Sequence, residues 1–248
     1  FFTPKLGGVF GDVKLSGGAI LNLVTNNLTA AGLNITAGSL NISAGRTYAF
    51  SSIVSAGAVN LNLNSGTGLT VGGNCDLSGF TTLSGSLGAT LTLAGNGSQF
   101  FNPGPTALAA QVILSGTGRY TVTANPLVSD SITINSGTWN WGAGLSHTIG
   151  KIKCTGGVME FGSSTVIASG SGPHDFSGLS SMTAGSGTLR FTGTGVQNFI
   201  PKAGTTYGNV QIMGGGTVQL TTYGMTVGSL TISSGTLNLS GSGLSHIV

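Results

Sequence analysis

Charge is the property that this chain lacks most. Asp, Glu, Lys and Arg together make up only 5% of its 248 residues, whereas about a quarter is usual in soluble domains. Amphipathic helices turn charged faces toward water, so this deficit argues against an ordinary soluble helical protein. The chain is also too apolar to be disordered, because disorder requires low hydrophobicity and usually high charge.

Basic clusters and long apolar runs are missing as well. The net charge of +3 comes from eight basic and five acidic residues that are scattered along the chain, so we expect no nucleic-acid partner. No stretch of about 18 apolar residues continues without Ser, Thr, Asn or Gly, so we expect no membrane-spanning helix. No signal peptide opens the chain, and its start without Met, at "FFTPKLGG", leads us to expect processing or trimming.

Cysteine is equally scarce. Only Cys75 and Cys154 occur, and they form no CxxC pair. If the chain is a stack of coils, these two residues are about 14–19 Å apart, whereas a disulfide needs Cα atoms within about 7 Å. We expect both to be small core residues, which say nothing about the redox compartment.

Glycine and repeated segments are what the chain has in abundance. It contains 45 Gly, and Leu, Ile, Val and Thr alternate between them, which is typical of an all-β protein. "GLNITAGSLNI" from Gly32, "SITINSGTWNW" from Ser131 and "SLTISSGTLNL" from Ser229 share one outline at intervals of about 98 residues. Such a period is the mark of a repeat architecture.

The long repeat divides the chain into about two and a half copies, at approximately residues 1–98, 99–196 and 197–248. We interpret residues 1–248 as a single continuous domain, a window of a longer array. Within each copy a shorter template recurs about every 20 residues in the clearest pairs and about every 30 in the rest, which makes four or five coils per copy. The shorter template begins near Val13, Leu33, Ile53, Val112, Ile132, Ile152 and Met182.

A coil of this length buries almost nothing by itself, so neighbouring coils must stack to form a core. We therefore predict a β-solenoid, or parallel β-helix, built from coils of about 20–30 residues. Gly38, Gly137 and Gly235 mark corners that need positive φ, and the alternation Leu237-Asn238-Leu239 predicts inward and outward side chains. The alternative fold is a string of immunoglobulin-like sandwiches. The 20-residue sub-period and the lack of a Cys–Trp–Cys core argue against it.

The acidic residues are the first candidates for catalysis. They are Asp12, Asp76, Asp130, Glu160 and Asp175. Asp76 and Asp175 occupy equivalent points of successive copies, about 19–24 Å apart in a stack of coils. Glycosidases place their carboxylates about 5–9.5 Å apart, so this pair is no such dyad. We expect corner carboxylates that accept backbone N–H bonds, and no catalytic residue.

The histidines and tryptophans are the remaining candidates. His147 and His246 are also equivalents, too far apart to share a metal ion, and Cys75 occupies the position that matches His174. We expect solvent-facing or corner histidines and neither a metal nor a cofactor. Trp139 and Trp141 replace Leu or Ile of the other copies, so we favour core packing over the alternative of a carbohydrate platform.

Other surface motifs carry little weight. Five N-x-Ser/Thr triplets arise freely in a chain so rich in these residues, at Asn27, Asn34, Asn41, Asn96 and Asn238. Calcium-binding GGxGxD repeats are missing. Thr-x-Thr steps such as those from Thr90 and Thr121 do not recur at one fixed position of the coil, so a flat Thr ladder is not expected.

Two stretches carry a resemblance to known proteins. "GSLTISSGTLNLSG" and "FTGTGVQNFIPKAGTTYGNVQIMGGGTVQL" resemble the Gly/Ser/Thr-rich repeats of large bacterial surface and secreted proteins, including haemagglutinin-like and autotransporter-type adhesins and repeat proteins of gliding bacteria. The resemblance covers nearly the whole chain. It implies export, an extracellular or cell-surface location, and a role as stalk, adhesin or fibre without catalytic residues.

These observations lead to one functional hypothesis and one alternative. The hypothesis is a non-catalytic structural protein, a β-solenoid segment of a bacterial surface fibre, filament or adhesin stalk. Neither "FFTP" nor "GLSHIV" resembles a polar cap, so we expect end-to-end or lateral self-association, with surface glycans as a further partner class. The alternative is a carbohydrate-acting β-helix enzyme or a carbohydrate-binding module.

Overall fold

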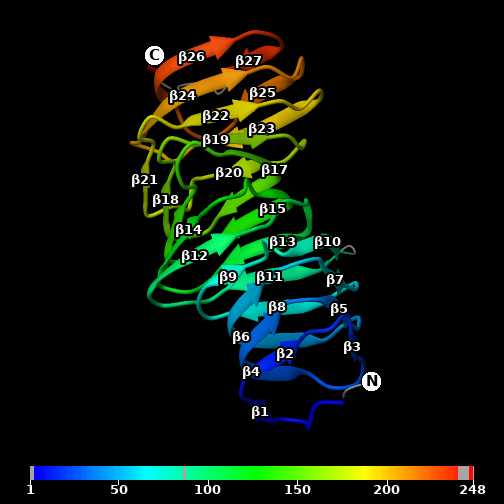
Figure 1. The fold of residues 1–248 in the computed structure, drawn as a ribbon. Coiled ribbons are helices and arrows are strands. Elements are labelled where there is room, and N and C mark those ends of the chain that lie inside the picture. The colour runs from blue at the N-terminus through cyan, green and yellow to red at the C-terminus, as the bar shows by residue number, and fades with distance from the viewer. Residues whose placement is uncertain (1–2, 86–87, 240–245, 248) are drawn as a thin grey trace. The chain divides into compact units, whose positions relative to one another are not determined.

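The computed structural model describes residues 3–85, 88–239 and 246–247. Within these residues it contains strands and turns but no helix (Figure 1), and 54% of them lie in strands. The stacked parallel coils confirm the predicted β-solenoid, with about 11 turns in all. The parallel pairing also makes the immunoglobulin alternative wrong, because such sandwiches are antiparallel.

The coils form two compact units, Phe1–Ser129 and Asp130–Val248, which we call unit 1 and unit 2. The interpretation of residues 1–248 as one continuous domain stays a prediction. The segments "FTPK" from Phe2 and "GLSHIV" from Gly243 lie partly outside the described residues.

Unit 1 contains the first fourteen strands. They are β1 (Val9–Phe10), β2 (Val13–Leu15), β3 (Ile20–Leu23), β4 (Leu28–Ile35), β5 (Gly38–Ile42), β6 (Thr47–Ser55), β7 (Val59–Leu63), β8 (Gly68–Val71), β9 (Cys75–Asp76), β10 (Phe80–Gly85), β11 (Thr90–Leu93), β12 (Ser98–Asn102), β13 (Leu108–Leu114) and β14 (Arg119–Val122).

Unit 2 contains the remaining strands, although the first of them, β15, begins just before the boundary between the two units. They are β15 (Val128–Ile134), β16 (Thr138–Asn140), β17 (Ser146–Cys154), β18 (Val158–Glu160), β19 (Thr165–Ala168), β20 (His174–Asp175), β21 (Ser181–Thr183), β22 (Thr188–Phe191), β23 (Val196–Ile200), β24 (Thr206–Ile212), β25 (Thr217–Leu220), β26 (Thr226–Ile232) and β27 (Thr236–Asn238).

The strands of unit 1 stack in three parallel columns. The first runs through β1, the start of β4, the start of β6, β8, β11 and the end of β13. The second runs through β2, the end of β4, the end of β6, β9, β12 and β14. The third column is a separate four-stranded sheet, β3-β5-β7-β10. Paired residues lie 19 to 26 positions apart in sequence.

The order of strands repeats with the long sequence period. β13 spans the positions of β1 and β2, β14 to β23 correspond to β3 to β12, and β24 begins a third copy. The third column ends at β10 in unit 1, and its equivalent in unit 2, β16-β18-β21, ends at β21. The predicted interval of about 30 residues between Ile152 and Met182 is wrong, because Met182 pairs with Met159 of the preceding coil.

Alternation along each strand separates the core from the surface. In β7, Val59, Leu61 and Leu63 point inward and are buried, while Asn60 and Asn62 are half-buried on the outer face. The period of two therefore forms a dry aliphatic interior and a polar exterior, as expected for a pleated strand. On the last described coil, Leu239 is 43% exposed.

The corners explain why glycine is so frequent. Gly38, Gly137 and Gly235 have φ of 110°, 70° and 96°, so the predicted left-handed corners are confirmed. Gly38 is required for space as well, because a Cβ there would lie 2.2 Å from the backbone oxygen of Ala19 in the preceding coil. Glycine thus permits both the sharp turn and the close stacking of coils.

Candidate functional site

The two equivalent carboxylates are bound to their own turns. Asp76 Oδ1 accepts the backbone N–H of Ser78 at 3.0 Å and the side-chain amide of Asn102 at 3.1 Å. In unit 2, Asp175 Oδ1 accepts the N–H and the hydroxyl of Ser177 at 2.9 and 2.6 Å. The prediction that both accept backbone N–H bonds at a corner is confirmed.

The other acidic residues lie apart on the surface. Asp12 and Asp130 are exposed, and Glu160 accepts the amide of Asn140 at 2.6 Å. Among residues 3–85, 88–239 and 246–247, no three His, Cys, Asp or Glu side chains come together as a metal ion would require.

The prediction that the histidines face solvent or a corner is wrong for two of them. His147 and His174 are fully buried. Nε2 of His147 donates to the carbonyl of Trp141 at 2.8 Å, and Nε2 of His174 donates to the carbonyl of Gly170 at 3.2 Å. Strand parity was the missed signal, since His147 lies two residues before the inward Ile149.

Burial changes the acid–base properties of both imidazoles. Desolvation lowers the pKa of His147 to about 4, although its bond to the Trp141 carbonyl opposes the shift. Burial lowers the pKa of His174 too, and the charge of Lys151 adds to the effect. Both side chains are therefore neutral near pH 7. His246 is half-buried, and its Nδ1 accepts the N–H of Met225 at 3.3 Å.

The tryptophans and cysteines belong to the core. Trp139 and Trp141 are fully buried and meet edge to face, with ring centroids 5.4 Å apart. This confirms the predicted core packing and makes the carbohydrate platform wrong. Cys75 and Cys154 are buried free thiols, as predicted, and burial raises the pKa of each.

A buried polar contact in unit 2 was not predicted from the sequence. The side-chain amide of Gln197, which is 1% exposed, donates to the carbonyls of Ala168 and Gly170 at 2.9 and 2.7 Å and accepts the N–H of Gly193 at 2.9 Å. The Ala168 carbonyl also accepts the N–H of Thr192, and the Gly170 carbonyl also accepts from His174. The N–H of Gly193 depends on Gln197, and such a group is costly when unpaired.

In unit 1 the three backbone groups at the equivalent positions are bonded by a different side chain. The hydroxyl of Tyr120 donates toward the carbonyls of Val71 and Gly73, at 3.1 and 2.9 Å, and accepts the N–H of Gly95 at 3.2 Å. Burial raises the pKa of Tyr120 to about 12, so the hydroxyl keeps its proton. We call these two contacts the polar plugs.

The outer face of the third column in unit 1 carries a ladder of amides. Asn41 Nδ2 donates to Asn22 Oδ1 at 2.7 Å, and Asn62 Nδ2 donates in turn to Asn41 Oδ1. The hydroxyl of Ser84 then donates to Asn62 Oδ1. The ladder thus links β3, β5, β7 and β10 from coil to coil, along the sheet labelled in Figure 1.

A shallow hollow of about 570 Å³ lies over this ladder, and we call it the asparagine groove. Its lining residues are Asn22, Val24, Asn41, Ser43, Asn62, Asn64 and Ser84. A parallel row on the same sheet is bonded as well, because Asn60 Nδ2 donates to Ser39 at 3.3 Å and Thr82 donates to Asn60 at 2.7 Å.

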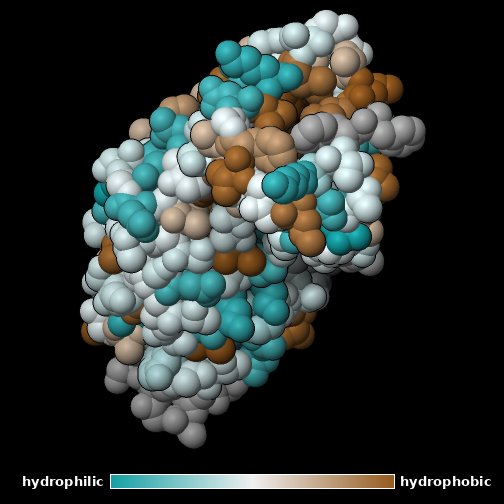
Figure 2. Space-filling model, turned by 90° about the horizontal axis from the view of Figure 1, so that it is seen from below, coloured by the Kyte–Doolittle hydropathy of each residue, from teal (hydrophilic) through white to brown (hydrophobic). Residues whose placement is uncertain are grey.

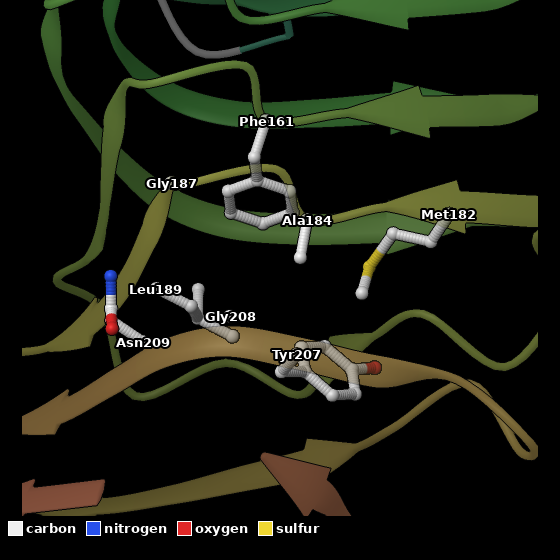
Figure 3. A pocket seen from close by; sticks show the side chains of 8 residues that line it. All are labelled: Phe161, Met182, Ala184, Gly187, Leu189, Tyr207, Gly208 and Asn209. Carbon is white, nitrogen blue, oxygen red and sulfur yellow. The ribbon is translucent and has the colours of Figure 1, made fainter. Parts of the chain in front are cut away.

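The outer side chains of unit 2 also bond between coils. Thr155 donates to Asn135 and Ser229 donates to Asn209, each at 2.7 Å. The third column of unit 2 ends beside a small apolar gap, into which Phe161, Met182 and Tyr207 point (Figure 3). The gap has no room for a water molecule, so it is a packing defect rather than a ligand site.

Comparison of the chain with protein-family models, with curated proteins and with solved structures gave no significant match. In the described part of the chain, no helix has the length and apolar character needed to cross a bilayer. The function is therefore argued from the repeat fold and from the side chains on its surface.

Proposed function

We propose that this chain is a non-catalytic structural segment of a bacterial extracellular or cell-surface fibre, filament or adhesin stalk. The observation that carries the proposal is the use of outer polar side chains for bonds between coils. The amide ladder from Asn22 to Ser84 does this in unit 1, and the pairs at Asn135 and Asn209 do it in unit 2. These groups reinforce a stack instead of converging on one reacting centre, as an active site would require.

The character of the surface supports the same role. On the face seen in Figure 2, hydrophilic and hydrophobic residues are interspersed, and much of the area lies in the pale middle of the scale. With charged residues at 5%, little like-charge repulsion opposes close lateral packing of neighbouring copies.

The last described coil has two apolar side chains that a further coil can cover. Ile232 and Leu239 are 47% and 43% exposed, whereas the equivalent residues on an inner coil, Ile134 and Trp141, are fully buried. A further coil stacked beside these residues, from the same or another chain, would bury both side chains.

Electron microscopy and fibre diffraction of the purified chain test the proposal. We expect filaments whose diffraction has a meridional reflection at about 4.8 Å, the spacing of stacked strands. Ile232→Lys places a charge on the stacking edge and should shorten or abolish the filaments. Thr231→Lys places the same charge on the exposed neighbouring residue and should leave them intact.

The contrary result is equally definite. Particles that stay monomeric at every concentration and degrade a polysaccharide would replace the structural role by the alternative of a carbohydrate-acting β-helix enzyme.

A further inference from the structure

The amide ladder leaves hydrogen-bonding capacity unused in the asparagine groove. A side-chain amide has two N–H donors and an oxygen with two lone pairs. Asn41 uses one N–H on Asn22 and one lone pair on Asn62. Because Asn41 and Asn62 are only half-buried and line the hollow, their second N–H and second lone pair are open to a molecule that lies in it.

The chemistry of the lining narrows the class of that molecule. All seven lining residues are uncharged, and six of the seven are Asn or Ser. Without a carboxylate the groove is a poor site for a divalent cation, and without Arg or Lys it offers no charge-assisted bond to an anion. Neutral amides and hydroxyls that both donate and accept match a neutral ligand covered with hydroxyl groups.

The geometry of the lining favours a polymer over a small molecule. The same side chains recur on β3, β5 and β7, and the hydroxyl of Ser84 continues the row on β10. Successive strands are about 4.8 Å apart, so a chain with repeating hydroxyl groups meets a similar set of partners at each coil. We propose that the asparagine groove binds a neutral glycan chain laid along the third column of unit 1.

A second copy of the protein is a poorer occupant. Two identical hollow faces leave a space between them, and interface cores are rich in aromatic and other apolar side chains. Val24 is the apolar residue in the lining. A hydroxyl-rich polymer fills the hollow and satisfies its amides without needing an apolar surface.

The expected affinity follows from the same arrangement. Each hydrogen bond adds little net free energy, because water competes for the same groups. Binding must then accumulate over several coils, as in a multivalent contact. We expect weak binding of a monosaccharide and affinity that rises with oligosaccharide length until the four strands are covered.

Affinity electrophoresis of the full chain tests this proposal. Native gels would contain dextran, galactomannan or xyloglucan as neutral probes and alginate as an acidic control. Oligosaccharides of increasing length from any retarding polymer would then be titrated by calorimetry. We expect retardation by a neutral polymer, none by alginate, and no dependence on whether filaments form.

Three variants locate the binding. Ser43→Leu fills the hollow and removes no side-chain bond of the ladder, so it should weaken binding about tenfold, the loss of one or two hydrogen bonds. The double variant Asn41→Ala/Asn62→Ala should do the same. Asn34→Ala removes an exposed Asn on another column and should bind like the wild type. Melting curves show whether each variant is folded.

Three results would overturn the glycan proposal. The first is the absence of retardation by all three neutral polymers, and the second is binding that Ser43→Leu leaves unchanged. The third is a dimer, detected by sedimentation velocity, that Ser43→Leu dissolves, because the groove would then be an interface between copies. None of these bears on filament formation through the edge at Ile232, so the two proposals fail separately.

Discussion

Units 1 and 2 build the same coils around different interiors. Four core positions illustrate this, and every residue at them is buried. They are Cys75, Leu77, Leu93 and Phe101 in unit 1, and His174, Phe176, Phe191 and Phe199 in unit 2. In unit 2 the rings pack together, with centroids of Phe199 at 5.2 Å from Phe191 and 5.4 Å from Phe176.

The difference teaches that the path of the coil does not depend on one particular core. Parallel ladders and glycine corners set the path of the coil. Side chains at neighbouring core positions then fill the interior in different combinations of size. A second pair of positions follows this rule. Ile42 and Tyr48 of unit 1 are replaced by Trp141 and His147, so a larger residue at one position accompanies a smaller one at the other.

The largest effect is expected where unit 2 depends on its aromatic core. Trp141→Ala should lower the free energy of unfolding by about 3–5 kcal/mol, because it removes a buried indole and leaves a cavity. Ile42→Ala at the equivalent position removes fewer atoms and should cost less. Urea unfolding gives both losses of free energy. Equal losses would contradict the proposal that unit 2 depends more strongly on its aromatic core.

An exchange of residues sharpens this test. Trp141→Ile alone should leave space beside His147, whose ring centroid lies 4.9 Å from that of Trp141, and His147→Tyr should refill it. We expect the double variant to be more stable than the sum of the two single changes by about 0.5–3 kcal/mol. Simple additivity would show that the two positions do not compensate.

The next largest effect is that of acid, which should destabilise unit 2 more than unit 1. Residues 1–129 contain no His, whereas His147 and His174 are buried in unit 2. The unfolded chain binds protons on these imidazoles below about pH 6.5. In the folded chain His147 binds a proton only near its lowered pKa of about 4, and burial lowers the pKa of His174 too. The unfolded state therefore gains protons first, and unit 2 loses stability as the pH falls from about 6.5 toward 4, by about 3 kcal/mol for His147 alone.

Hydrogen exchange resolved by peptide measures this acid effect in each unit. Protection of backbone amides should fall in unit 2 over that pH range and stay unchanged in unit 1. His147→Tyr should remove part of the acid sensitivity, and Tyr48→His should transfer it to unit 1. Identical pH profiles in the two units would refute the assignment to these buried imidazoles.

The polar plugs should give a smaller and more even effect. Gln197→Leu and Tyr120→Phe each remove a side chain that bonds three backbone groups and leave the N–H of Gly193 or Gly95 without its acceptor, at a cost of about 1–3 kcal/mol. We expect faster exchange at the amides of Gly193 and Gly95, respectively, because each donates to its plug. Loss of stability in only one unit would mean that the two plugs are not equivalent.

The turn carboxylates should give the smallest effect. Asp175→Ala and Asp76→Ala each remove a local bond to a backbone N–H two residues ahead, so each should cost about 0.5–1.5 kcal/mol. Asn substitutions, which keep an acceptor oxygen, should recover most of this loss. Thermal melting compares the two pairs, and a loss well above this range would indicate a role beyond the turn.

Much of this fold could be predicted because it depends on local patterns. The period of two along each strand identified the inward face that contains Trp139 and Trp141, and the bond from Asp76 to Ser78 spans two residues of one turn. Short-range contacts of this kind are encoded in adjacent residues. The same parity could have placed His147 in the core, had it been preferred to the usual exposure of histidine.

Contacts between coils were decided by the tertiary structure alone. Met182 pairs with Met159 because the turn lengths in between set which strand continues the column. The plugs come from non-equivalent positions, Tyr120 on β14 and Gln197 on β23, and meet matching backbone groups only after stacking. The asparagine groove likewise exists only when β3, β5 and β7 lie in register. By itself the sequence determined the coil and its two faces, because these need only alternation and glycine corners. Stacking decided which side chains meet, because that depends on the summed length of every intervening turn.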